Sequence, residues 1–204
     1  MKIDAGRAAQ LIAIALVVTA TTQGVYVILG GGGNSQVAYP IWRIETLSAL
    51  VVALFSFVIV KRNALVGGCL AVGGIFNLIQ TGMGLTMFYQ LGYGGEGPPN
   101  PVFFPVLRMS FFLYFAAKAA LGVAAVILGL TLWRNSSGIW RMFGMLVGVV
   151  GLVALVLNTA AMLMGLGVVR YAGASGVIAA VLTAVALIRV IGQPDGVVDS
   201  TERP

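Results

Sequence analysis

The sequence predicts an all-α fold: a polytopic transmembrane helical bundle of six spans with both termini on the cytoplasmic side. Hydrophobic residues make up 59% of the 204-residue chain and charged residues only 9%, against about 25% charged in an average soluble domain. Twelve basic and six acidic side chains cannot form a polar surface, so most of the surface must face lipid. Six apolar stretches approach the roughly 20 residues that a helix needs to cross a bilayer.

The first three spans are predicted at residues 8–30, 44–60 and 64–90. The first is followed by a glycine run, Gly30 to Gly33, which is typical of a turn. The second is the shortest, and it gains length only if residues 44–46 are already helical, which brings Glu45 to the membrane edge. The third begins directly after Asn63.

The last three spans are predicted at residues 107–133, 142–165 and 172–191. The segment GYGGEGPPNP, from Gly92 to Pro101, precedes the fourth span, and Asn135 to Gly138 separates the fourth from the fifth. Residues 1–191 therefore form a single transmembrane domain, and residues 192–204 are expected to be a mobile cytoplasmic tail. An alternative treats residues 1–20 as a signal peptide and leaves five spans.

Basic residues set the predicted orientation. With the N-terminus inside, eight basic residues fall on the cytoplasmic side: Lys2, Arg7, Lys61, Arg62, Arg134, Arg141, Arg189 and Arg203. The other side receives Arg43, Arg108 and Arg170. This positive-inside bias predicts a protein integral to the plasma (inner) membrane with both termini inward.

Several classes of chemistry are excluded by what the sequence lacks. It has no His, which removes His-ligated metals, Ser-His and Cys-His nucleophile pairs and imidazole relays. No two of the six acids share an apolar span, and Cys69 is the only thiol. We therefore expect no catalytic residues, no metal, no cofactor and no enzyme activity. The basic residues are scattered, so nucleic acid is not an expected partner.

Polar side chains form one predicted layer toward the outer face. Five of them lie 16 to 18 residues from the nearest cytoplasmic basic residue, or about 24 to 27 Å along a helix: Gln23, Glu45, Gln80, Lys118 and Asn158. Asn77 and Thr81 share a helix face with Gln80, and Thr159 follows Asn158. These eight residues are the candidate ligand-binding residues.

Lys118 interrupts the apolar run Phe111 to Leu132. Its side chain either reaches the headgroups, pairs with Glu45 at the matching depth, or contacts an anionic ligand or lipid phosphate. The amides of the layer either form hydrogen bonds between helices or line a pocket for a small polar molecule or lipid headgroup. A continuous path across the membrane is disfavoured, because the inner two-thirds of each span is nearly free of polar groups.

Small residues at helical spacing predict close helix contacts. They are Ala172, Gly176, Ala180 and Ala184 in the sixth span, Ala116, Ala120 and Ala124 in the fourth, and Gly144 and Gly148 in the fifth. The first helix adds the strip Ala5, Ala9 and Ala13. These faces serve either internal packing or contact with a membrane-protein partner or a second copy of the chain. Aromatic residues of the outer loops, such as Tyr39, Trp42 and Tyr93, are belt anchors or a lid over a ligand.

The expected function is therefore a non-catalytic membrane protein or accessory subunit, bound to the lipid bilayer, that holds a small molecule or lipid headgroup near the outer face and acts with partner subunits. The alternative is a self-contained small-molecule transporter or channel. In architecture the chain resembles the substrate-binding components of energy-coupling-factor vitamin transporters: about 200 residues, six helices, termini inside and an outward pocket. The resemblance implies that Ala5, Ala9 and Ala13 dock a coupling subunit, although Ala5 precedes Arg7 and no vitamin-specific motif is present.

Overall fold

The computed structural model describes residues 3–30, 34–94 and 100–192. Their six long helices are α1 Ala5–Ile28, α2 Ser35–Val60, α3 Ala64–Met83, α4 Phe103–Asn135, α5 Gly138–Met164 and α6 Val169–Ile191. A π-helix, η1 Gly84–Phe88, continues α3, and a 3₁₀-helix, η2 Gly165–Val168, joins α5 to α6. All six spans are long and apolar enough to cross a membrane. The predicted all-α class with six spans is confirmed, and it indicates an integral membrane protein embedded in a lipid bilayer.

Five of the six helices begin earlier than predicted, α2 by nine residues and α1, α4, α5 and α6 by three or four. α2 starts at Ser35 rather than at residue 44, so with 26 residues it is longer than α1 and α6 and is not the shortest span. Its start is capped by Asn34, whose side chain accepts from the N–H of Gln36 at 3.1 Å. Pro40 is the sixth residue of α2 and lies inside the helix, where its missing N–H removes one hydrogen bond to the preceding turn. α4 likewise starts at Phe103, and it accommodates Pro105 in its first turn.

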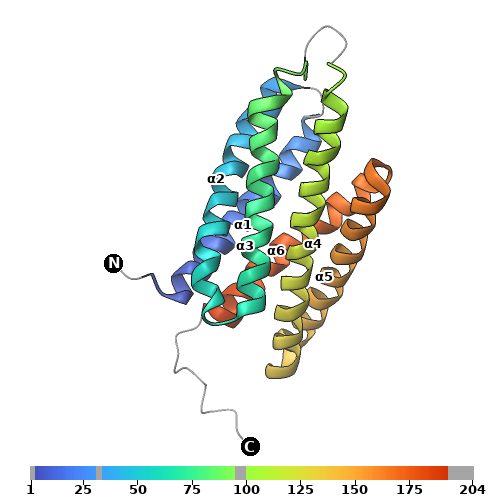
Figure 1. The fold of residues 1–204 in the computed structure, drawn as a ribbon. Helices are drawn as coiled ribbons and strands as arrows, with labels where there is room; N and C mark the ends of the chain where they lie inside the picture. Colours follow the sequence, from blue (N-terminus) through green and yellow to red (C-terminus); the bar gives the residue numbers. More distant parts are fainter. Residues whose placement is uncertain (1–2, 31–33, 95–99, 193–204) are drawn as a thin grey trace, which may run out of the picture.

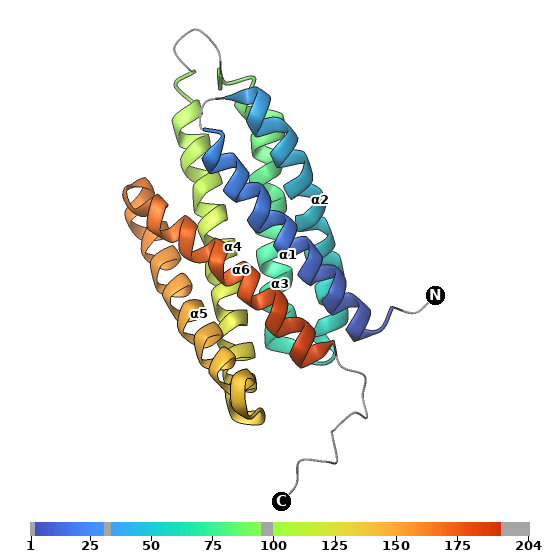
Figure 2. The same cartoon turned by 180° about the vertical axis from the view of Figure 1, so that it is seen from behind.

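The helices form two layers, seen from opposite sides in Figures 1 and 2. Helices α2, α3, α4 and α5 lie side by side in chain order, and α1 and α6 cross behind them. We call the end that carries Asp4, Lys61 and Gly192 the proximal end, and the end that carries Ser35 and Phe103 the distal end. Both the start of α1 and the end of α6 lie at the proximal end, where a Cβ on Gly6 would stand 3.2 Å from the carbonyl oxygen of Gly192.

Glycines set a close helix contact between α4 and α5. A Cβ on Gly122 would lie 2.8 Å from the carbonyl oxygen of Gly151, and one on Gly144 would lie 2.6 Å from the N of Trp133. Gly129 faces the backbone of Gly148 in the same way. Because these neighbours are backbone atoms, the two helices can approach this closely only without side chains at these positions.

The predicted small-residue faces lie mostly inside the bundle. Ala172, Ala180, Ala184, Ala116 and Ala124 are buried, Ala120 is half-buried, and Gly176 packs against the stem of Lys118. On α1, Ala9 and Ala13 are 0% and 2% exposed, because α1 packs against α2 and α6. The strip that the resemblance assigns to a coupling subunit is therefore covered by this chain itself. The predicted tail falls, after Gly192, outside the described residues.

An apolar core fills the proximal half of the bundle. Its fully buried members include Ile12, Ile59, Leu128, Leu187 and Ile191, which come from α1, α2, α4 and α6. Side chains such as Leu54, Phe57 and Ile14 point outward and are more than half exposed, as expected for helices surrounded by acyl chains. The polar groups of the spans are thus placed above a closed apolar zone.

Candidate functional site

Four helices bring polar side chains together in the interior. The ammonium of Lys118 on α4 donates to Oε1 of Gln23 on α1 at 3.0 Å, and the hydroxyl of Thr22 donates to Oε1 of Glu45 on α2 at 3.1 Å. We call Thr22, Gln23, Glu45, Asn77 and Lys118 the polar cluster. Adjacent residues of α1 therefore bind the acid and the base, so this helix connects the two charges.

Lys118 is held inside the protein rather than at the lipid surface. Its side chain is 4% exposed, and Gly176 of α6 packs on it so closely that a Cβ there would lie 2.8 Å from Cδ. Its ammonium also lies 5.3 Å from the centre of the Tyr114 ring, within the range of a cation–π contact. Among the three alternatives, the geometry disfavours a side chain that reaches the headgroups.

Glu45 is buried as well, at 4% exposure, but it forms no ion pair with Lys118 within 4.0 Å. The two charges attract each other across the interior without direct contact. Isolated buried charges are costly, and the usual compensation is a close pair or added hydrogen bonds. Here Thr22 and Gln23 supply the hydrogen bonds, and the direct pair considered from the sequence is replaced by these indirect contacts.

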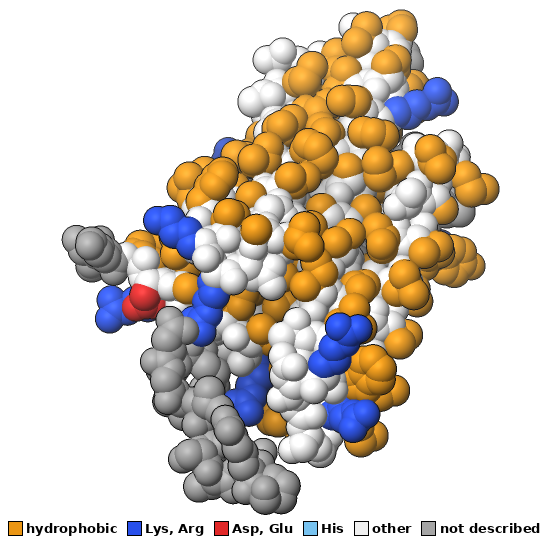
Figure 3. Space-filling view, turned by 60° about the horizontal axis from the view of Figure 1, so that its bottom comes forward, with side chains coloured by type: hydrophobic (Ala, Val, Ile, Leu, Met, Phe, Trp, Pro, Cys, Tyr) orange, Lys and Arg blue, Asp and Glu red, His pale blue; other side chains and the backbone are white. Residues whose placement is uncertain are grey.

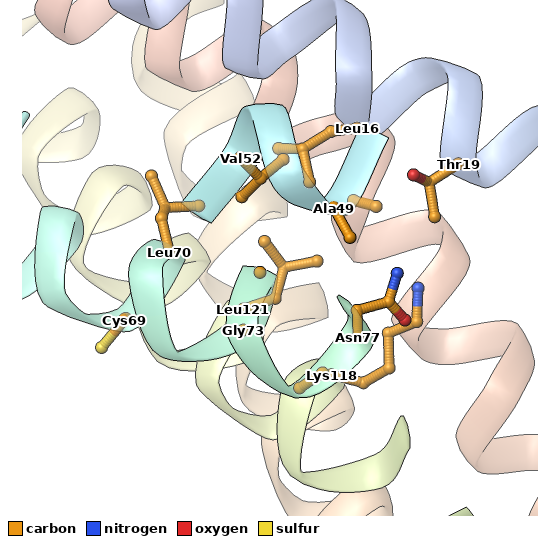
Figure 4. A pocket seen from close by; sticks show the side chains of 13 residues that line it. Leu16, Thr19, Ala49, Val52, Cys69, Leu70, Gly73, Asn77, Lys118 and Leu121 are labelled. Carbon is orange, nitrogen blue, oxygen red and sulfur yellow. The ribbon is translucent and has the colours of Figure 1, made fainter. Parts of the chain in front are cut away.

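A small cavity adjoins the polar cluster. It has a volume of about 40 Å³, enough for about three or four water molecules at roughly 10 to 15 Å³ each. Asn77, Lys118 and Thr19 line it on the distal side, as Figure 4 shows for the labelled side chains. On the proximal side four buried apolar residues, which we call the apolar floor, close it: Leu16, Val52, Leu70 and Leu121. The cavity is thus polar on one side and sealed toward the proximal end.

Two polar atoms of the cluster have no hydrogen-bond partner. They are Oδ1 of Asn77 and Nε2 of Gln23, and both are buried. A buried polar atom without a partner costs about 1 to 3 kcal/mol, so such atoms usually mark a position for water, an ion or a ligand. An unsatisfied acceptor and an unsatisfied donor beside an ammonium and a cavity form an arrangement suited to a small polar molecule.

Aromatic residues close the cluster on the distal side. Tyr26, Trp42, Phe88, Tyr93 and Phe103 pack together with ring centres 5.5 to 6.4 Å apart, and we call them the aromatic cover. On α1 and α2 the cover lies about one helical turn from Gln23 and Glu45, since three residues span about 4.5 Å. The cluster is therefore enclosed between the aromatic cover and the apolar floor.

The π-helix η1 forms part of this cover. A Cβ on Gly84, its first residue, would lie 2.9 Å from Cε3 of Trp42, so a glycine lets the indole ring pack on the helix backbone. π-Helical turns are rare and occur often at functional sites. The sequence assigned Trp42 and Tyr93 to outer loops as anchors or a lid, and the structure places them directly over the polar cluster.

Three predicted site residues lie away from the cluster. Asn158 is fully buried between α5 and α6, where its amide donates to the carbonyl of Ala172 at 3.1 Å and to Oγ of Ser175 at 3.4 Å. Thr159 is exposed on the outer side of α5. Gln80 is half-buried on α3 and contacts no member of the cluster through a hydrogen bond in the described part of the chain. These residues were predicted at the same depth as the polar cluster, but equal depth did not bring their side chains to it.

Thr81 is close to the cluster, and two neighbouring threonines were missed by the sequence analysis. Thr81 is fully buried, and the hydroxyl of Thr46 on α2 donates to it at 2.8 Å. Neither Thr46 nor Thr22 was among the candidates from the sequence. The sequence could have pointed to both threonines because each is next to a candidate residue: Thr22 precedes Gln23, and Thr46 follows Glu45.

The site offers hydrogen bonds and charge rather than metal ligands. Within residues 3–30, 34–94 and 100–192, no group of three Cys, Asp or Glu side chains lies close enough to hold a metal ion. Comparison of the chain with known proteins finds no matching family model, curated protein or solved structure.

Proposed function

We propose that this chain is a non-catalytic integral membrane protein that binds a small polar molecule, or the headgroup of a lipid, at the polar cluster. The observation that carries the proposal is the pair of buried, unpartnered amide atoms on Asn77 and Gln23 beside the Lys118 ammonium. Other buried atoms, such as Oδ1 of Asn158, also have no partner, but this pair lies beside the ammonium of Lys118, and Asn77 and Lys118 line the cavity. A ligand there would satisfy atoms that otherwise lower stability.

The size of the cavity limits which molecules can bind without a movement of the aromatic cover. At about 40 Å³ it holds only water-sized species in the closed form. A larger molecule enters when the aromatic cover moves, and Trp42 over Gly84 is the contact that must open. We assign the opening to the distal side, which the positive-inside bias makes the outer face.

In its closed form this chain offers no path by which a bound molecule could leave the cluster toward the proximal end. The apolar floor of Leu16, Val52, Leu70 and Leu121 separates the cluster from the proximal end. We therefore propose that the protein works as an accessory subunit with a membrane-protein partner. A self-contained transporter is the alternative, and it requires the floor itself to open.

Replacement of Asn77 by Leu distinguishes a role in ligand binding from a role in the stability of the fold. Leu has nearly the shape of Asn and removes an acceptor that has no partner, so we expect an unchanged or raised melting temperature. Native mass spectrometry of the protein purified in mild detergent should show a small-molecule adduct on the wild type that is lost from Asn77→Leu.

The matched control is Asn158→Leu, an amide at similar depth that joins α5 to α6. It should lower the melting temperature and keep the adduct. An adduct that persists in Asn77→Leu, or an adduct-free wild-type protein, would contradict the proposal.

A further inference from the structure

The polar cluster contains one buried acid and one buried base. Among the residues that the structure describes, Glu45 and Lys118 are the only charged side chains that are buried, each 4% exposed. The other charged side chains lie on the surface, and Figure 3 shows several of them, mostly Lys and Arg, on a largely hydrophobic face. The described interior of the bundle therefore has a net charge of zero. A proton that moved from Lys118 to Glu45 would leave this sum unchanged.

Both charged groups keep unused capacity for hydrogen bonds. The ammonium of Lys118 has three N–H donors, and one of them binds Oε1 of Gln23 at 3.0 Å. Glu45 has two acceptor oxygens, and within the described chain only Oε1 accepts a hydrogen bond, from Thr22 at 3.1 Å. The two groups do not use the remaining capacity on each other, because no ion pair joins them within 4.0 Å.

The neighbouring amides add one open donor and one open acceptor. Nε2 of Gln23 is buried without a partner, and it belongs to the same amide that accepts from Lys118. Oδ1 of Asn77 is also buried without a partner, and Figure 4 shows this amide beside the end of the Lys118 side chain at the cavity. Ala49, one helical turn from Glu45 on α2, lines the same cavity. Open donors and open acceptors therefore occur together around one cavity.

A ligand with a net charge would be costly in this place. The apolar floor and the aromatic cover separate the cluster from bulk water, so a bound anion or cation would add a buried charge that has no counter-charge. A molecule with one negative and one positive group avoids this cost. Lys118 and Gln23 can donate to its negative group. Glu45 and Asn77 can accept from its positive group.

We propose that the ligand of the polar cluster is a zwitterion, with its positive group at Glu45 and its negative group at Lys118. This inference rests on the proposed function and names the class of molecule that the cluster binds. Small amino acids and the headgroup of phosphatidylethanolamine share this chemistry. Either one requires the aromatic cover to open, because the closed cavity of about 40 Å³ holds only water-sized species.

The test compares four small molecules as ligands of the purified full chain in mild detergent. Glycine is a zwitterion, acetamide is neutral, acetate is an anion and methylammonium is a cation. The Kd of each is obtained from the rise of the melting temperature with its concentration. Glycine should bind roughly thirtyfold more tightly than acetate or methylammonium, because only the latter two add an uncompensated buried charge. Any of the three other molecules binding as tightly as glycine would overturn the inference.

A lipid comparison identifies the source of the zwitterion. If none of the four small molecules raises the melting temperature, the ligand is a lipid headgroup. Phosphatidylethanolamine must then stabilise the protein more than phosphatidylglycerol, which carries a net negative charge. The reverse order would overturn the inference.

Removing one charge should change which ligand is preferred. Glu45→Gln keeps an acceptor for Thr22 and leaves one positive charge in the cluster, so acetate should bind roughly thirtyfold more tightly than to the wild type. If this variant does not fold, Lys118→Met should show the opposite change and favour methylammonium. The matched control Arg43→Gln removes an exposed charge two residues from Glu45 and should change each Kd less than about threefold. Equal gains in acetate binding by Glu45→Gln and Arg43→Gln would overturn the inference.

Failure of this inference can be told from failure of the proposed function. An adduct that is lost from Asn77→Leu, but whose mass identifies an anion or a cation, would overturn the zwitterion and keep the binding site. A wild-type protein that carries no adduct and that no probe stabilises would overturn both.

Discussion

Replacing Lys118 by Met removes the positive charge of the polar cluster and leaves Glu45 buried with only the Thr22 hydroxyl. The cost has two parts. A hydrogen bond to a charged group, here Lys118 to Gln23 at 3.0 Å, contributes about 1.5 to 3 kcal/mol. The attraction between Lys118 and Glu45 adds less than about 4 kcal/mol, the value for unit charges 4 Å apart at an effective dielectric constant of 20, because the two groups lie beyond 4.0 Å.

A double-mutant cycle isolates the attraction. Glu45→Gln keeps an acceptor for Thr22 and removes the negative charge, so Lys118→Met/Glu45→Gln carries neither charge. We expect the double variant to be more stable than the sum of the two single losses by about 1 to 3 kcal/mol. The assay is reversible unfolding in mixed micelles, read by circular dichroism. Additive losses, within about 0.5 kcal/mol, would show that the two charges do not interact and would refute the reasoning.

Three further predictions concern packing around the site. In a thermal melt, Gly129→Ala should destabilise the protein by about 1 to 3 kcal/mol, because its Cβ would meet the α5 backbone. The control Gly148→Ala should be near neutral in the same assay, because its Cβ meets nothing within 4 Å. Gly84→Ala should displace the Trp42 ring and increase quenching of tryptophan fluorescence by acrylamide; unchanged quenching would argue against a tightly packed cover. Thr81→Val should cost about 1 kcal/mol, since its hydroxyl bonds α2 and its own helix, and a larger loss would indicate a role beyond this bond.

The sequence was sufficient for the class and the number of spans, because apolar runs of about 20 residues report directly on bilayer crossing. It also identified most of the polar cluster. Gln23 and Lys118 were matched in depth, and they are hydrogen-bonded to each other. Depth counted along a helix depends only on the rise per residue, which is why the register of these groups was predictable.

The rotation of each helix about its own axis was not predictable from the sequence. The differences between the predicted and the observed site residues follow from this rotation. Asn158 matches the depth of the cluster but faces α6, where it bonds the backbone at Ala172. Thr81 and Thr159 each follow an amide residue, yet Thr81 is fully buried while Thr159 is exposed. In spans that are apolar on all sides, no polar face fixes the rotation, so it is set by close contacts between helices.

The position of the apolar floor bears on the choice between an accessory subunit and a self-contained transporter. A charged or strongly polar ligand passing Leu16, Val52, Leu70 and Leu121 would leave the hydrogen bonds of the cluster for an apolar zone, which costs several kcal/mol for each unsatisfied group. Opening the floor must therefore bring water or polar groups between α1, α2, α3 and α4. In the described residues tight glycine contacts join α4 to α5 and also α3 to α2, through Gly74, whereas α1 has no such contact, so α1 is the element most free to move relative to α4. Cross-linking α1 to α4 at the level of the floor should therefore block release in a self-contained transporter and leave ligand binding at the cluster intact.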